Sequence, residues 1–83
     1  MTKAEFDMLL NNAASGKVSS MRGIAMLCFK MAEGVMAHDI RKATIFIELG
    51  NGWKELSESG FTDFGNELDQ VKIATREAFS NSF

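Results

Sequence analysis

The sequence contains no proline, no tyrosine, one cysteine and one histidine among its 83 residues. Because a disulfide needs two thiols, Cys28 cannot crosslink the chain, and a domain this short buries only about 60–65% of its unfolded surface. A lone cysteine in an apolar segment is typically a small buried hydrophobe, as we expect here. The lack of proline, low-complexity segments and repeats leaves no sign of a linker, so we expect a single domain over residues 1–83.

Side chains that carry catalysis or bind metals are scarce. No His, Cys or Glu pair has zinc-site spacing, and Glu33 precedes His38 by five residues, the wrong interval for a shared metal on a helix. His38 and Cys28 lie about 280° apart around a continuous helix and therefore do not share a face. The segment Gly50-Asn51-Gly52 lacks the Gly-Lys of a phosphate loop. We expect no cofactor or metal, and a protein that is not an enzyme.

The N-terminal segment has the pattern of an amphipathic helix. Thr2 and Glu5 have capping-box spacing, in which each side chain accepts a hydrogen bond from a free backbone N–H of the first turn. Apolar residues follow from Phe6 to Ala13 at helical intervals on one face. Gly16 suits the left-handed conformation that ends many helices.

The segment 21–37 is apolar almost all the way round, because only Arg22, Lys30 and Glu33 are charged. A helix of this kind must be buried on most sides, which one short chain can hardly achieve. We predict that Ser19 or Ser20 caps this helix and that dimerisation completes its burial. Steps of three and four residues define a helix-packing seam, which we predict to be the homo-oligomer interface. The seam residues are Met21, Ile24, Cys28, Met31 and Val35.

The segment 39–60 is compatible with more than one structure. A continuous helix would place Phe46, Leu49, Trp53 and Leu56 on one stripe, but it would carry Gly50 and Gly52 in its interior. We favour a helix with Asp39 as N-cap that ends near Leu49, a Gly-Asn-Gly break, and a short turn before a loop at 57–60. The alternative is a β-hairpin over residues 44–56, because Asn51-Gly52 is a strong hairpin signal and the run 44–47 favours strands.

Thr62 or Asp63 is expected to cap a last helix with an apolar seam and a charge order that matches the helix dipole. That seam comprises Phe64, Leu68, Val71, Thr75 and Ala78, with Phe79 beside it. The predicted fold is therefore all-α: a small bundle of three to four short helices, completed by dimerisation, or a helical domain with a hairpin at 44–56.

Charge is distributed unevenly along the chain. Residues 1–47 carry six Lys or Arg and four acidic residues, whereas residues 48–83 carry three basic and seven acidic residues. An acidic segment could bind a protein with a basic surface, although a solvated helix face gives the same pattern. We predict partner contacts at the acidic residues and at Trp53, a residue type enriched in binding hot spots. A core position that covers the helix ends is an equally good prediction for Trp53. The acidic residues are Glu48, Glu55, Glu58, Asp63, Glu67 and Asp69.

The segment Gly34-Val35, followed by Ile40, resembles the turn and recognition helix of helix-turn-helix proteins. This resemblance implies a reading helix over residues 36–45. It departs from the family pattern at Lys30, where a small alanine is expected, and an acidic chain attracts phosphates poorly. The implied DNA-contacting residues are His38, Arg41, Lys42 and Thr44.

Together these features predict a small, cytoplasmic, non-catalytic interaction protein: a regulator, adaptor or inhibitor that binds another macromolecule as a homo-oligomer. The helix-turn-helix regulator is the alternative. The apolar segment is too short to span a bilayer, and it has too few charges for an interfacial helix. We therefore expect no membrane partner.

Overall fold

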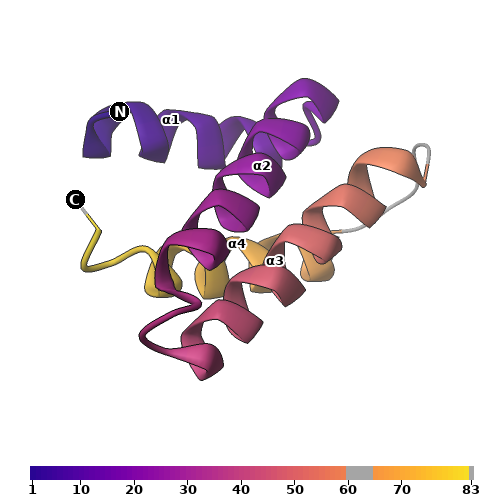
Figure 1. Cartoon of the computed structure of the whole chain (residues 1–83). Helices are drawn as coiled ribbons and strands as arrows, with labels where there is room; N and C mark the ends of the chain where they lie inside the picture. The colour runs from indigo at the N-terminus through magenta and orange to yellow at the C-terminus, as the bar shows by residue number, and fades with distance from the viewer. Residues whose placement is uncertain (60–64, 83) are drawn as a thin grey trace.

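The computed structural model describes residues 1–59 and 65–82, and the side chains of residues 1–59 and 67–82. These residues form the helices α1 (Lys3–Ala14), α2 (Val18–Val35), α3 (Ile40–Glu58) and α4 (Gly65–Ala78), and no strand (Figure 1). The predicted all-α bundle is confirmed. The alternative hairpin at 44–56 is wrong, because α3 runs through that segment.

The ends of α1 are as predicted. The Thr2 hydroxyl accepts from the Glu5 backbone N–H at 3.2 Å, while the Glu5 carboxylate accepts from the Thr2 backbone N–H at 3.4 Å. Gly16 has a φ of 103°, and the hydrogen bond from the Lys17 N–H to the Asn12 carbonyl closes the helix at 3.1 Å. Between these caps, α1 buries the side chains on the predicted face, including Phe6 and Leu10.

Helix α2 begins earlier than predicted, at Val18 with Lys17 as its N-cap, so neither Ser19 nor Ser20 is the cap. The left-handed turn at Gly16 brings the chain directly into the new helix. Ser20 then lies buried within the first turn.

Helix α3 begins as predicted, because the Asp39 carboxylate accepts from the Lys42 backbone N–H at 3.1 Å. The predicted break after Leu49 is wrong, and so is the loop predicted from Ser57: α3 continues to Glu58. Within this continuous helix Gly50 is buried beneath the ring of Phe29 from α2. A Cβ at Gly50 would lie 2.8 Å from Phe29 Cε1, so only glycine allows this approach.

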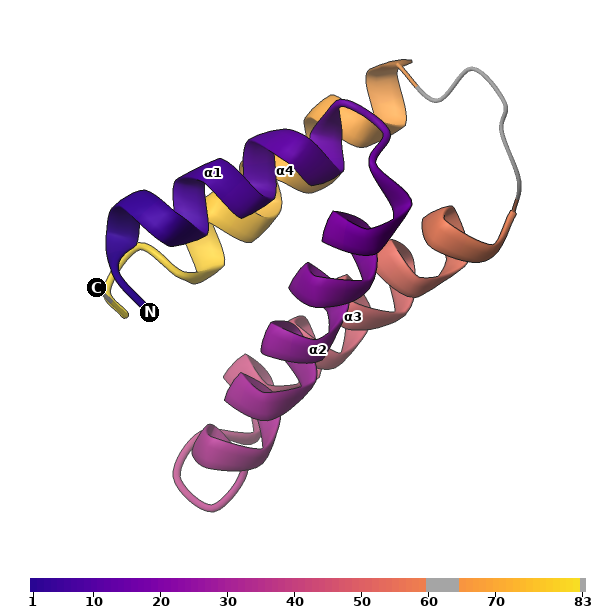
Figure 2. The same cartoon turned by 90° about the horizontal axis from the view of Figure 1, so that it is seen from above.

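Helices α2 and α3 run back along each other as an antiparallel pair, while α4 contacts both α3 and α1 (Figures 1 and 2). The ring of Phe79, which follows α4, packs against both α1 and α3. Its centroid is 4.8 Å from that of Phe6 and 5.0 Å from that of Phe46. The Trp53 indole N–H donates to the Thr75 hydroxyl at 2.9 Å, which joins α3 to α4 inside the core.

The seam predicted for the last helix is confirmed where it is described: Thr75 and Phe79 are buried, and the seam's other described residues are half-buried. Phe64 and the predicted caps Thr62 and Asp63 lie outside the described residues. Among the described residues, no helix is long and apolar enough to cross a membrane.

Candidate functional site

The predicted interface seam of α2 packs inside the chain. Met21, Ile24 and Cys28 are buried in the core, and Met31 and Val35 are half-buried against it. Helices α1 and α3 of the same chain cover this face. The pattern therefore identified a true helix-packing seam, but these side chains are occupied by contacts within one chain. The association surfaces must be sought on the outside of the bundle.

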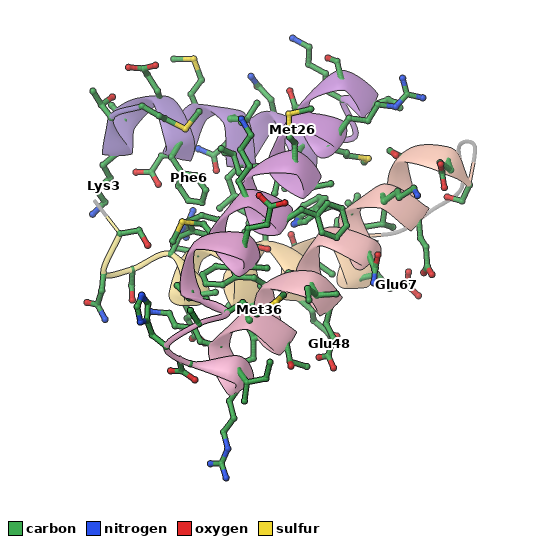
Figure 3. All side chains as sticks on the ribbon, viewed as in Figure 1. Lys3, Phe6, Met26, Met36, Glu48 and Glu67 are labelled. Carbon is green, nitrogen blue, oxygen red and sulfur yellow. The ribbon has the colours of Figure 1, made fainter. Side chains whose placement is uncertain are left out.

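The outer face of α2 carries an apolar groove of about 400 Å³, which we call the α2 groove. Met26, which is labelled in Figure 3, lines this groove with 60% of its surface exposed. Phe29 packs on Gly50 and also lines the groove. Charged side chains surround this apolar floor. The groove is lined by Arg22, Ala25, Met26, Phe29, Lys30, Glu33 and Lys54.

Sequence reasoning missed this groove, although the signal was present. Arg22, Met26, Phe29 and Glu33 recur at intervals of four, three and four residues, which is the spacing that identified the inner seam. A helix apolar on two faces carries two such stripes. Pattern alone does not say which stripe faces the core.

A second groove, of about 320 Å³, runs between α3 and α4 and is called the α3–α4 groove. Leu56 and Val71 give it an apolar floor, and Gly52 adds no side chain that would fill it. Glu55 of α3 and Glu67 of α4 supply carboxylates. Ser59 and Gln70 complete the lining. Two of the predicted acidic contact residues thus meet across one apolar groove.

The other predicted partner-binding residues are placed differently. Glu48, Glu58 and Asp69 are exposed but do not line this groove, and Asp63 lies outside the described residues. Figure 3 shows Glu48 on the same side of the molecule as Glu67. Trp53 is not a surface anchor, because its exposed fraction is 0%. The prediction for Trp53 was wrong because tryptophan is equally suited to filling a core between helices.

The predicted reading helix 36–45 is not one helix. Helix α2 ends at Val35, and α3 begins only at Ile40, after a turn. His38, Arg41 and Thr44 are exposed, whereas Lys42 is half-buried. The α3 segment of this region is also held by local contacts, since the Thr44 hydroxyl donates to the Ile40 carbonyl at 2.9 Å.

A groove beside Arg41 and Lys42 also contains Asp39 and Glu77. The two carboxylates offset the two cations, and this surface therefore lacks the excess of positive charge that phosphate binding requires. The antiparallel course of α2 and α3 also differs from the steep crossing of helix-turn-helix motifs.

Reactive chemistry has little support in the described residues. Burial raises the pKa of the Cys28 thiol to about 12, although a backbone hydrogen bond opposes this shift. A thiol with such a pKa is almost entirely protonated near neutral pH and is a poor nucleophile. No group of three or more His, Cys, Asp or Glu side chains among the described residues could hold a metal ion.

We found no family model, no curated protein and no solved structure that matches this chain. The two grooves and the charges around them are therefore the features of this chain that bear on its function.

Proposed function

We propose that this chain is a small, non-catalytic interaction protein that binds another macromolecule and also associates with a second copy of itself. The observation that carries the proposal is the α3–α4 groove, in which Glu55 and Glu67 border an apolar floor. A groove of this kind suits a partner segment that combines apolar and basic side chains. Regulation of a partner with a basic surface fits this groove. The predicted location of the protein is the cytoplasm.

Affinity and specificity have different sources in such a groove. Burial of apolar side chains against Leu56 and Val71 provides the main favourable free energy. The carboxylates contribute mostly by steering and orienting a basic partner, because exposed ion pairs are individually weak. We therefore expect binding that depends on both components and weakens as salt concentration rises.

A synthetic amphipathic helical peptide of leucine and lysine provides a defined probe for calorimetric titration. The double variant Glu55→Gln/Glu67→Gln should weaken its binding about fivefold, because two favourable ion pairs are lost. The control variant Asp69→Asn/Glu77→Gln removes the same net charge from exposed positions that do not line the groove. It should leave binding unchanged. Equal losses in both variants, or no binding by the unmodified protein, would contradict the proposal.

The helix-turn-helix alternative has a separate test. Retention of the protein on duplex DNA at low salt, reduced by Arg41→Gln, would favour nucleic-acid binding over the interaction module. We expect no such retention, because Asp39 and Glu77 lie beside the cations of this surface.

A further inference from the structure

We infer that a second copy of this chain docks on the α2 groove, with the two α2 helices antiparallel and related by a two-fold axis. The inference rests on the proposed self-association and specifies its surface. The docking stripe consists of Arg22, Met26, Phe29 and Glu33. It lies on the opposite side of α2 from the seam that forms the core.

The stripe has the spacing of a helix–helix contact. Its intervals of four, three and four residues keep all four side chains on one narrow face of α2. Met26 and Phe29 form its apolar centre, and both line the groove. An unbranched, adaptable methionine that is 60% exposed is suited to packing against a partner side chain.

The order of residues in the stripe makes it complementary to itself. In an antiparallel pair, positions equidistant from the midpoint between Leu27 and Cys28 face each other. Arg22 then faces Glu33 of the second copy, and Met26 faces the second copy's Phe29. A two-fold axis repeats each contact, so one geometry joins opposite charges at both ends and apolar side chains in the centre.

The groove also carries two further cations, Lys30 and Lys54, which leave each copy with an excess of positive charge at the edges of this contact. Lys54 comes from α3, whereas Lys30 follows Phe29 by one position and lies on the flank of α2 away from α3. Their aliphatic stems can cover the edges of the contact while the ammonium groups stay in water. The contact is short, since Arg22 and Glu33 are about 16 Å apart along the helix. We therefore expect a reversible dimer.

The decisive test reverses the charges of Arg22 and Glu33, which face each other across the two-fold axis. Sedimentation equilibrium over a range of protein concentrations measures the dimer dissociation constant of each variant. Arg22→Glu and Glu33→Arg should each raise the dimer dissociation constant about tenfold, because each reversal occurs twice in a symmetric dimer. The combined variant Arg22→Glu/Glu33→Arg should restore the wild-type constant. Both substitutions are favourable with respect to the helix dipole, because they place an acid near the N-terminus of α2 and a base near its C-terminus. The fold should therefore be retained.

The apolar centre of the stripe has its own matched pair of variants. Met26→Glu should abolish dimerisation, whereas Met8→Glu on α1 should not, although Met8 is 67% exposed. Circular dichroism should show unchanged helix content in both.

A wild-type protein that sediments at 9.2 kDa at every concentration would overturn both this inference and the proposed self-association. A dimer that persists in Met26→Glu, or that the combined charge exchange fails to restore, would overturn the docking geometry alone. Binding of the basic peptide in the α3–α4 groove is independent of either result.

Discussion

Burial determines the roles of Trp53 and Cys28, each the single residue of its type in this chain. The Trp53 ring fills the core, and its N–H has a partner in the Thr75 hydroxyl, which itself donates to the Val71 carbonyl at 2.7 Å. The described part of the protein leaves no buried side-chain nitrogen or oxygen without a hydrogen-bond partner. Cys28 is also fully buried in the core, but its thiol can ionise. Because burial raises the pKa of this thiol in the folded chain, the stability of the fold should depend on pH.

Stability should decrease as the pH rises above 9.0, the ordinary pKa of the thiol, toward the folded-state pKa of about 12. In this range the unfolded chain releases the Cys28 proton while the folded chain retains it, so unfolding is favoured. Urea unfolding followed by Trp53 fluorescence at several pH values measures the effect. Cys28→Ala should show a shallower decrease, and the difference between the two proteins gives the contribution of the thiol. Parallel curves would contradict the assignment.

At the scale of the helices, local signals predicted the ends of α1 and the start of α3, where one side chain satisfies a nearby backbone group. The Thr2 capping box and the Asp39 cap are contacts of this kind. Local signals did not favour the continuity of α3, because Gly50 and Gly52 lie inside it. Glycine within a helix is unfavourable by about 1 kcal/mol relative to alanine, and the compensating contact of Gly50 is with Phe29 of another helix.

Two glycines of α3 should therefore respond oppositely to the same substitution. Gly52→Ala should raise the free energy of unfolding by about 0.5–1 kcal/mol, because its Cβ would meet nothing within 4 Å. Gly50→Ala should lower it, because the new Cβ displaces the Phe29 ring. Urea unfolding of both variants provides the measurement. A gain of equal size in both would show that the approach of Phe29 does not require glycine.

At the scale of the whole molecule, the sequence predicted a helical bundle but not which stripe of α2 would face inward. Two stripes of similar spacing run along that helix, and the choice depends on how α1 and α3 pack around it. The α3–α4 groove was foreseeable only in part, since Glu55 and Glu67 belonged to the predicted acidic set. Their meeting across Leu56 and Val71 depends on how α4 packs.

The contacts between helices are unequal in extent. The contact between α2 and α3 is the most extensive, whereas α1 and α4 contact each other through few residues. Phe79, which follows α4, packs against Phe6 of α1 and Phe46 of α3. Phe79→Ala should therefore destabilise the fold by about 3–5 kcal/mol, through lost burial and the cavity that remains.

In Phe79→Ala, we expect α1 and α4 to open more readily than the rest of the bundle. Hydrogen exchange should accelerate most in α1 and α4 and least in α2 and α3, because regions with few buried contacts open at the lowest free energy. Ala78→Gly, at the half-buried last position of α4, is the control: it weakens the helix by about 1 kcal/mol without removing the aromatic contacts. A uniform acceleration across all helices in Phe79→Ala would instead show that the bundle unfolds as one cooperative unit.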